Sequence, residues 1–244
     1  MEAEGEKVPK IKICGITSGQ EAEYLNEAKA DYAGFVFYPK SRRNVSMEQA
    51  ARLAAYLDGR ILKVAVTVSP TAEFVQKAKS MGFDLLQVHG EFSREARAAA
   101  QIPVWRAVNI SDGASLAAFV QEEKKQGAPD VCGYVADGAA YGAGKTFDWE
   151  KISRQIQKYT AGKQLILAGG LTAENVTDGI RYFHPDIVDV SSGVEKQGKK
   201  SMEKIKCFIR KVRENEQESI LREIRRTVCG GISDEYVGGA GFNL

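Results

Sequence analysis

The sequence predicts an α/β protein that folds as a single (β/α)8 barrel. Short apolar runs of four to eight residues, rich in Val and Ile, recur eight times along the chain. Longer segments with apolar residues at helical spacing lie between them, and several begin with Ser, Thr or Asp, which cap a first helical turn. Eight strand–helix units favour a closed parallel barrel, and a length of 244 residues suits that architecture.

The expected strands are, in chain order, residues 11–16, 32–38, 61–68, 84–90, 103–110, 130–137, 163–170 and 186–193. Helical patterns between them include residues 46–59, 70–82 and 172–183. The main alternative is an open doubly wound sheet, whose dinucleotide-binding form carries G-x-G-x-x-G after its first strand. Because CGITSGQ stands at that position, this form is disfavoured.

The alternation of expected strands and helices predicts where the barrel begins and ends. We expect residues 10–213 to form it, after a flexible N-terminus of residues 1–9. Residues 214–244 are expected to continue the last helix and then to form a mobile, Gly-rich tail.

Composition excludes several classes of partner. The chain has 34 basic and 32 acidic residues, so its net charge of +2 gives no electrostatic reason to expect nucleic acid or an acidic membrane. The four cysteines form no C-x-x-C pair and only two histidines could join them, which disfavours a metal site. No apolar run approaches a membrane span, and the opening MEAEGEK lacks the layout of a secretion signal. We therefore expect a cytoplasmic protein with reduced thiols.

Several expected strands place polar side chains on one face. In the first, Ile11 and Ile13 share one face, and Lys12 and Cys14 share the other. If the apolar faces lie under the helices, the residues that point into the barrel are Lys12, Cys14, Gln87, His89, Arg106, Asp137 and Asp189. Buried ionised groups cost several kcal/mol unless they are paired. The set is therefore either a functional site or, in part, a buried cluster such as Lys12 with Asp189, and strand ends suit the first reading best for Cys14 and Asp137.

Two Gly-rich turns predict a phosphate site. Gly169 and Gly170 follow the seventh strand, and Ser192 and Gly193 follow the eighth, where free backbone N–H groups and positive helix ends converge. Turns at these two places are the recurrent phosphate site of such barrels, so a phosphorylated substrate is expected. The segment SRRN (41–44) brings arginines to the same rim, either to grip a carboxylate or as a solvated loop. The long loop DGAAYGAGKTFDW (137–149) is expected to close over a ligand.

Six motifs taken in order resemble phosphoribosylanthranilate isomerase, the tryptophan-pathway enzyme family with a TIM-barrel fold. They are KICGIT, GFVFYPKSRRNVS, LLQVHGE, D…GAGKTFDW, LILAGGLTAENV and VDVSSGVE. The resemblance spans residues 10–212. It implies an Amadori rearrangement of N-(5-phosphoribosyl)anthranilate to 1-(2-carboxyphenylamino)-1-deoxyribulose 5-phosphate without metal or organic cofactor. The sequence does not fix the oligomeric state, and a monomer or a homodimer is expected.

The resemblance also implies roles for particular residues. Cys14 matches the general base, Asp137 the general acid, and Arg43 the arginine near the anthranilate moiety. The Gly169–Gly170 and Ser192–Gly193 turns match the phosphate loops, and His89 and Asp189 join the expected substrate-binding residues. As the acid, Asp137 needs a raised pKa, and Cys14 needs help to ionise, for which Lys12 is a candidate.

Departures from the family pattern and two alternatives stay open at this point. Tyr141–Gly144 replaces the usual Gly-Gly-Ser/Thr-Gly, Gln197–Gly198 replaces Pro-Gly, and Ser201 replaces a common Asp. These changes bear on loop closure and rate more than on the reaction type. The alternatives are the histidine-pathway isomerase, in which an Asp would replace Cys14, and a barrel that has lost catalysis and serves as a scaffold or regulator.

Overall fold

The computed structural model describes residues 8–109, 118–119, 121–123, 125, 131–138, 149–160 and 162–214. The expected flexible start (1–9) and C-terminal extension (214–244) lie outside the described residues except for residues 8, 9 and 214. Most of the loop 137–149, which was expected to close over a ligand, lies outside them too.

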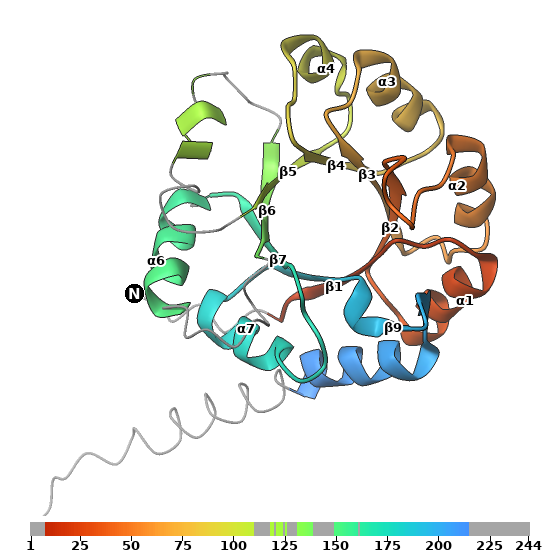
Figure 1. Cartoon of the computed structure of the whole chain (residues 1–244), viewed down its shortest axis with the longest axis vertical. Helices are drawn as coiled ribbons and strands as arrows, with labels where there is room; N and C mark the ends of the chain where they lie inside the picture. The colour runs from red at the N-terminus through yellow and green to blue at the C-terminus, as the bar shows by residue number, and fades with distance from the viewer. Residues whose placement is uncertain are drawn as a thin grey trace, which may run out of the picture.

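Eight parallel strands close into a barrel in chain order, and β8 pairs with β1 (Figure 1). The strands are β1 (Lys10–Cys14), β2 (Tyr32–Phe37), β3 (Leu62–Val68), β4 (Leu85–His89), β5 (Val104–Asn109), β6 (Val131–Asp137), β7 (Gln164–Ala168) and β8 (Ile187–Val190). Seven strands fall within their expected runs and β1 begins one residue before its run, so the predicted (β/α)8 barrel is confirmed.

The helices form a ring outside the strands (Figure 1). They are α1 (Gly19–Ala28), α2 (Met47–Ala54), α3 (Ala72–Ser80), α4 (Arg94–Ala99), α6 (Trp149–Thr160), α7 (Val176–Phe183) and the helical residues 202–214. Hydroxyl side chains begin the first four, where Ser18, Ser46, Thr71 and Ser93 each accept a hydrogen bond from a backbone N–H of the first turn.

A short irregular segment connects β8 to the last helix. It consists of the 3-10 turn η1 (Ser192–Val194) and a hairpin of β9 (Glu195–Lys196) with β10 (Lys199–Lys200). The buried Glu21 of α1 accepts hydrogen bonds from the Thr17 backbone and from the Lys200 backbone. This carboxylate therefore ties the loop after β1 to the hairpin after β8.

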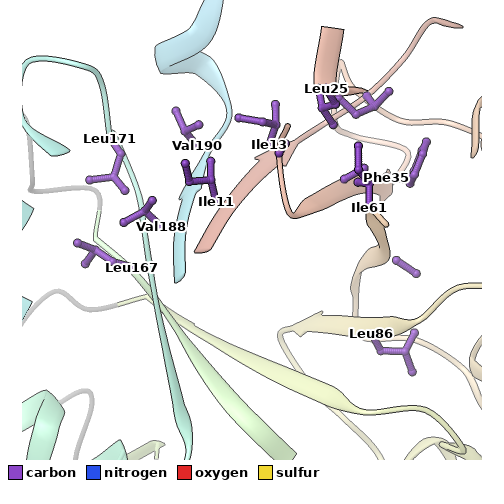
Figure 2. Close-up of a cluster of buried hydrophobic side chains, with 14 of the residues drawn as sticks. Ile11, Ile13, Leu25, Phe35, Ile61, Leu86, Leu167, Leu171, Val188 and Val190 are labelled. Carbon is purple, nitrogen blue, oxygen red and sulfur yellow. The ribbon is translucent and has the colours of Figure 1, made fainter. Parts of the chain in front are cut away.

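Apolar side chains fill two separate layers. One layer packs between strands and helices and includes Ile11, Ile13 and Phe35 (Figure 2). The other fills the barrel interior and includes Trp105 and Ile166. Ile11 and Ile13 are thus under the helices, as expected, which turns the alternate residues of β1 toward the barrel axis.

Strand β5 has the opposite orientation from the one expected, so the prediction that Arg106 points inward was wrong. Trp105 occupies the interior because position 133 of the neighbouring strand is a glycine, where an added Cβ would lie only 2.8 Å from Trp105 Cδ1. Arg106 points outward, where its Nε lies 3.1 Å from a carboxylate oxygen of Glu123 and its Nη1 donates to the Val88 carbonyl. A bulky indole thus takes the interior position, and the arginine has a paired environment outside.

Trp105 gives a test of the interior packing. Its ring is completely buried, and its Nε1 donates to Gln164 Oε1 at 3.1 Å. Trp105→Ala is expected to lower the free energy of unfolding in urea by about 3–5 kcal/mol, because the cavity cannot collapse between eight closed strands. Tyr56→Ala, at a side chain that is 54% exposed, should cost below about 1 kcal/mol. Equal losses in the two variants would contradict the packing described here.

Candidate active site

A cavity of about 380 Å³ opens at the C-terminal ends of the strands. It brings together all the predicted site residues except Gly193: Cys14, Arg43, His89, Asp137, Gly169, Gly170, Asp189 and Ser192. Gly193 lines a neighbouring hollow together with Gly170 and Ser192. Residues far apart in the sequence thus meet at the end of the barrel where such folds carry their chemistry.

Cys14 ends β1, and its thiol has room because the next strand has a glycine beside it. A Cβ at Gly34 would lie 2.8 Å from the Cys14 sulfur. Gly15 then turns the chain with φ of +85°, which an L-residue adopts only with strain. Ser191 Oγ donates to the Cys14 carbonyl at 2.9 Å, so the end of β1 is held by the loop after β8.

Lys12 and Asp189 form a buried ion pair inside the barrel. Lys12 Nζ lies 2.7 Å from Asp189 Oδ2, and both side chains are almost fully shielded from water. Burial alone would lower the pKa of Lys12, but the Asp189 carboxylate and the Cys14 thiol outweigh it and hold that pKa above its usual value. Asp189 Oδ1 has no hydrogen-bond partner among the described residues, although it lies beside the cavity. The expected pair therefore exists, and one acceptor of that pair remains available.

Burial raises the pKa of the Cys14 thiol above its usual value. Lys12 and Lys200 act in the opposite direction, while Asp189 adds to the increase. The sequence-based expectation that Lys12 helps the thiol to ionise is right in direction, but burial outweighs it. In the site without a substrate, the neutral thiol is favoured.

Asp137 ends β6 and also has a raised pKa. Burial is the largest cause, and Asp189 adds to it more than Lys12 subtracts. A Cβ at Gly169 would lie 2.6 Å from Asp137 Oδ1 and 2.5 Å from the Gly138 nitrogen, so the loop after β7 packs directly against this carboxyl group. The position admits only a glycine, which also has φ of +90° there. Asp137 is thus kept in a site that favours its protonated form.

The two Gly-rich turns are in direct contact. A Cβ at Gly193 would lie 2.0 Å from the Leu171 carbonyl oxygen, so no side chain fits between the turns. The turn after β7 is fixed by Asn175, whose Oδ1 accepts from the Thr172 N–H at 2.8 Å and whose Nδ2 donates to the Gly170 carbonyl at 3.0 Å. The start of α7 and the turn η1 therefore meet beside the cavity, where their N–H groups favour an anion.

Arg43 lines the cavity and is held by a residue that the sequence analysis missed. Its Nε lies 2.6 Å from Glu195 Oε1, and its Nη2 lies 2.9 Å from Glu195 Oε2. This hydrogen bonding raises the pKa of the arginine further above its usual value. The signal was an acidic residue in SSGVE, which follows the last strand, but its partner in SRRN lies some 150 residues earlier, and only the closed barrel joins them.

His89 and its neighbours form the remaining walls. His89 Nε2 lies 3.0 Å from the amide nitrogen of Gln87, and burial lowers the pKa of His89 to about 4. Apolar side chains, Val36, Val66 and Val68, line the side of the cavity near Arg43 on strands β2 and β3. The cavity therefore combines charged groups with an apolar wall.

Two further observations concern the described residues alone. They contain no group of three or more His, Cys, Asp or Glu side chains placed to hold a metal ion. None of their helices has the length and apolarity needed to cross a membrane.

The chain matches a family model described as N-(5'phosphoribosyl)anthranilate (PRA) isomerase over residues 11–211. It is 40% identical over 207 residues to N-(5'-phosphoribosyl)anthranilate isomerase of Streptococcus mutans, which covers 84% of this chain and 98% of the relative.

Solved structures agree with this match. A phosphoribosyl anthranilate isomerase in complex with reduced 1-(o-carboxyphenylamino)-1-deoxyribulose 5-phosphate superimposes with a TM-score of 0.72 at 33% identity, covering 84% of this chain and 99% of that one. Generated monomers of the dimeric enzyme from Thermotoga maritima give 0.69 at 35% identity, with 84% and 99% coverage.

His89 offers a pH-dependent test of the site's burial. With a pKa lowered from 6.5 to about 4, the folded chain resists a proton that the unfolded chain binds, so the free energy of unfolding should fall as pH falls across that window. In a His184→Gln variant, His89 is the one remaining histidine. Its imidazole NMR signals should stay those of a neutral ring at pH 6 and shift near pH 4. A midpoint near 6.5 would mean that water reaches the ring freely.

Proposed function

Because this chain belongs to the N-(5'-phosphoribosyl)anthranilate isomerase family, we propose that Cys14 and Asp137 carry its reaction as general base and general acid. The enzyme converts N-(5'-phosphoribosyl)anthranilate to 1-(o-carboxyphenylamino)-1-deoxyribulose 5-phosphate, an internal aldose-to-ketose isomerisation of tryptophan biosynthesis. The observation that carries the proposal is that a single cavity joins the thiol at the end of β1 to a carboxyl group at the end of β6.

Asp137 acts first in the proposed mechanism. Opening the ribose ring breaks the bond between C1 and the ring oxygen, and the leaving oxygen needs a proton. The raised pKa of Asp137 supports this role because it increases the fraction of carboxyl groups that hold a proton to give. The electron pair of the arylamine nitrogen replaces the lost bond at C1, so an iminium ion is formed.

Cys14 acts second, on the proton at C2. The positive iminium nitrogen acidifies that C–H bond and also stabilises a thiolate beside it, which opposes the effect of burial on the pKa of Cys14. The thiol gives its own proton to water, and the thiolate then takes the C2 proton so that the C1–C2 enamine forms. The enamine's C2 hydroxyl loses a proton and C1 gains one, which gives the ketone. Electrons move from C2 to C1 within the substrate, so no external oxidant or reductant is required.

The cavity also offers groups for each part of the substrate. The Gly169–Gly170 and Ser192–Gly193 turns would hold the phosphate through backbone N–H groups. The free oxygen Oδ1 of Asp189 would accept a hydrogen bond from a sugar hydroxyl, and His89 would line the same part of the site. Arg43 would receive the carboxylate of the anthranilate ring, which packs on the valine wall of β2 and β3.

We further propose that the enzyme works in the cytoplasm, as a monomer or a homodimer. The near-neutral net charge and the absence of a membrane-spanning helix among the described residues are consistent with this setting. The dimeric enzyme from Thermotoga maritima supports the second of these two oligomeric states.

A direct assay tests catalysis by this chain. Phosphoribosylanthranilate generated in situ is expected to lose its fluorescence faster with the protein than without it. The rate should be proportional to protein concentration. If the loss is no faster than in buffer, the chain is a barrel that has kept the fold and lost catalysis.

Variants at the two proposed catalytic positions test the roles. Cys14→Ser and Asp137→Asn should each lower kcat by about 10²–10⁴, because each removes a proton-transfer group from the transition state. Both should still bind the reduced product analogue by calorimetry with about the affinity of the unaltered enzyme, because the phosphate turns and Arg43 are retained. Near-normal turnover in either variant would rule out that residue's role.

A further inference from the structure

Glu195 is a buried carboxylate that three cationic side chains share. Its side chain is 5% exposed, and the ion pairs run to Arg42 at 2.5 Å, to Arg43 at 2.6 Å and to Lys200 at 2.8 Å. Burial alone would raise its pKa, but the hydrogen bonds from Arg43 and Lys200 outweigh burial and hold the pKa below the usual value. Glu195 is therefore an anion in a fixed position at the edge of the cavity.

The two oxygens of Glu195 bind one edge of the Arg43 guanidinium. Oε1 faces Nε and Oε2 faces Nη2, which is the bidentate arrangement that fixes the plane of the group. The stem of Arg43 crosses Gly15, where an added Cβ would lie 2.3 Å from Arg43 Cδ. The side chain is thereby held on two sides, and the opposite edge, with Nη1, has no hydrogen-bond partner among the described residues.

The charges of this cluster do not balance. Glu195 faces three cations, and the buried carboxylate of Glu21 adds a second negative charge that acts on Arg43, so one positive charge remains in excess beside the cavity. Lys12 and Asp189 form a separate, balanced pair within the barrel. An anion arriving at the free edge of Arg43 would therefore be favoured by the whole cluster as well as by the nearest guanidinium.

We propose that Glu195 is a positioning residue that gives the site its preference for arylamines bearing a carboxylate, because it fixes the edge of Arg43 that receives this group. The inference rests on the proposed function, in which Arg43 binds the anthranilate carboxylate. Glu195 itself touches no reacting atom in this role. It sets the plane of the guanidinium before the substrate arrives, so less freedom is lost on binding.

Glu195→Gln removes this positioning with a minimal change of shape. The amide keeps one oxygen, which can still accept from Lys200 and from Arg43 Nε. Its NH2 group replaces the oxygen that accepted from Arg43 Nη2 and from Arg42 Nη2, so donors face donors there. The guanidinium plane is therefore released while most of the packing is retained.

Glu123→Gln is a matched control that separates an effect on ligand preference from an effect on thermal stability. Glu123 is also a buried carboxylate between two arginines, 2.7 Å from Arg97 and 3.1 Å from Arg106, but it lies outside the cavity on the outer side of β5. Glu123→Gln should lower thermal stability as Glu195→Gln does, because each variant weakens a buried ion pair. It should have no effect on the choice between ligands.

The test compares two probes by calorimetry. One is the reduced product analogue with its carboxylate, and the other is the same molecule made from aniline, which lacks it. The unaltered enzyme should prefer the carboxylated probe by about 10- to 100-fold, as expected for charge-assisted hydrogen bonds. Arg43→Ala should abolish the preference, Glu195→Gln should reduce it about three- to tenfold, and Glu123→Gln should leave it unchanged. Affinity for the aniline probe should change by less than about threefold in all three variants.

The outcomes distinguish a failure of the inference about Glu195 from a failure of the proposed role of Arg43. If Arg43→Ala abolishes the preference and Glu195→Gln leaves it unchanged, Arg43 binds the carboxylate without help and the inference about Glu195 is wrong. Equal losses for both probes in Glu195→Gln would make Glu195 a structural residue and would also overturn it. If the unaltered enzyme shows no preference, the proposed role of Arg43 fails first, and the inference fails with it.

Discussion

The ion pair between Lys12 and Asp189 is the constraint on which the interior of this barrel depends. Two ionised groups in a closed strand cylinder would each cost several kcal/mol, and their contact at 2.7 Å offsets much of that cost. The same pair sets the chemistry around it. Asp189 raises the pKa of both Asp137 and Cys14, and Lys12 lowers both. The two charges act in opposite directions, and burial, the largest cause in each case, decides the direction.

An environment that raises the pKa suits one of the two proposed catalytic groups and opposes the other. A general acid benefits from an environment that keeps its proton, so Asp137 is ready before the substrate binds. A general base needs the reverse, which the proposed mechanism supplies to Cys14 only when a positive charge develops on the substrate. In that mechanism the site is prepared for ring opening, and the product of that step prepares it for proton removal.

Much of the fold and of the site could be predicted from the sequence, because strand periodicity and Gly-rich turns are local signals. All eight strands occur where they were expected, with only β1 beginning one residue early, and parity alone placed Lys12 and Cys14 inside the barrel. Parity failed at Arg106, because the choice of face on β5 depends on the space that Gly133 leaves for Trp105 on the neighbouring strand. Glu195 was missed for a related reason, since its partners are defined only when the barrel closes. The raised pKa of Cys14 depends on the depth of burial, which no local pattern reports.

The pairing of β1 with β8 also has a consequence for how the chain is made. Lys12 and Asp189 are separated by 177 positions, so the ammonium group leaves the ribosome long before its carboxylate partner. Until β8 emerges, burying Lys12 would leave a charge without compensation, and water is the more favourable environment for it. Incomplete barrels are thereby disfavoured during synthesis. The same late strand carries Asp189 and leads into the turn with Ser192, so the proposed site is complete only when the barrel closes.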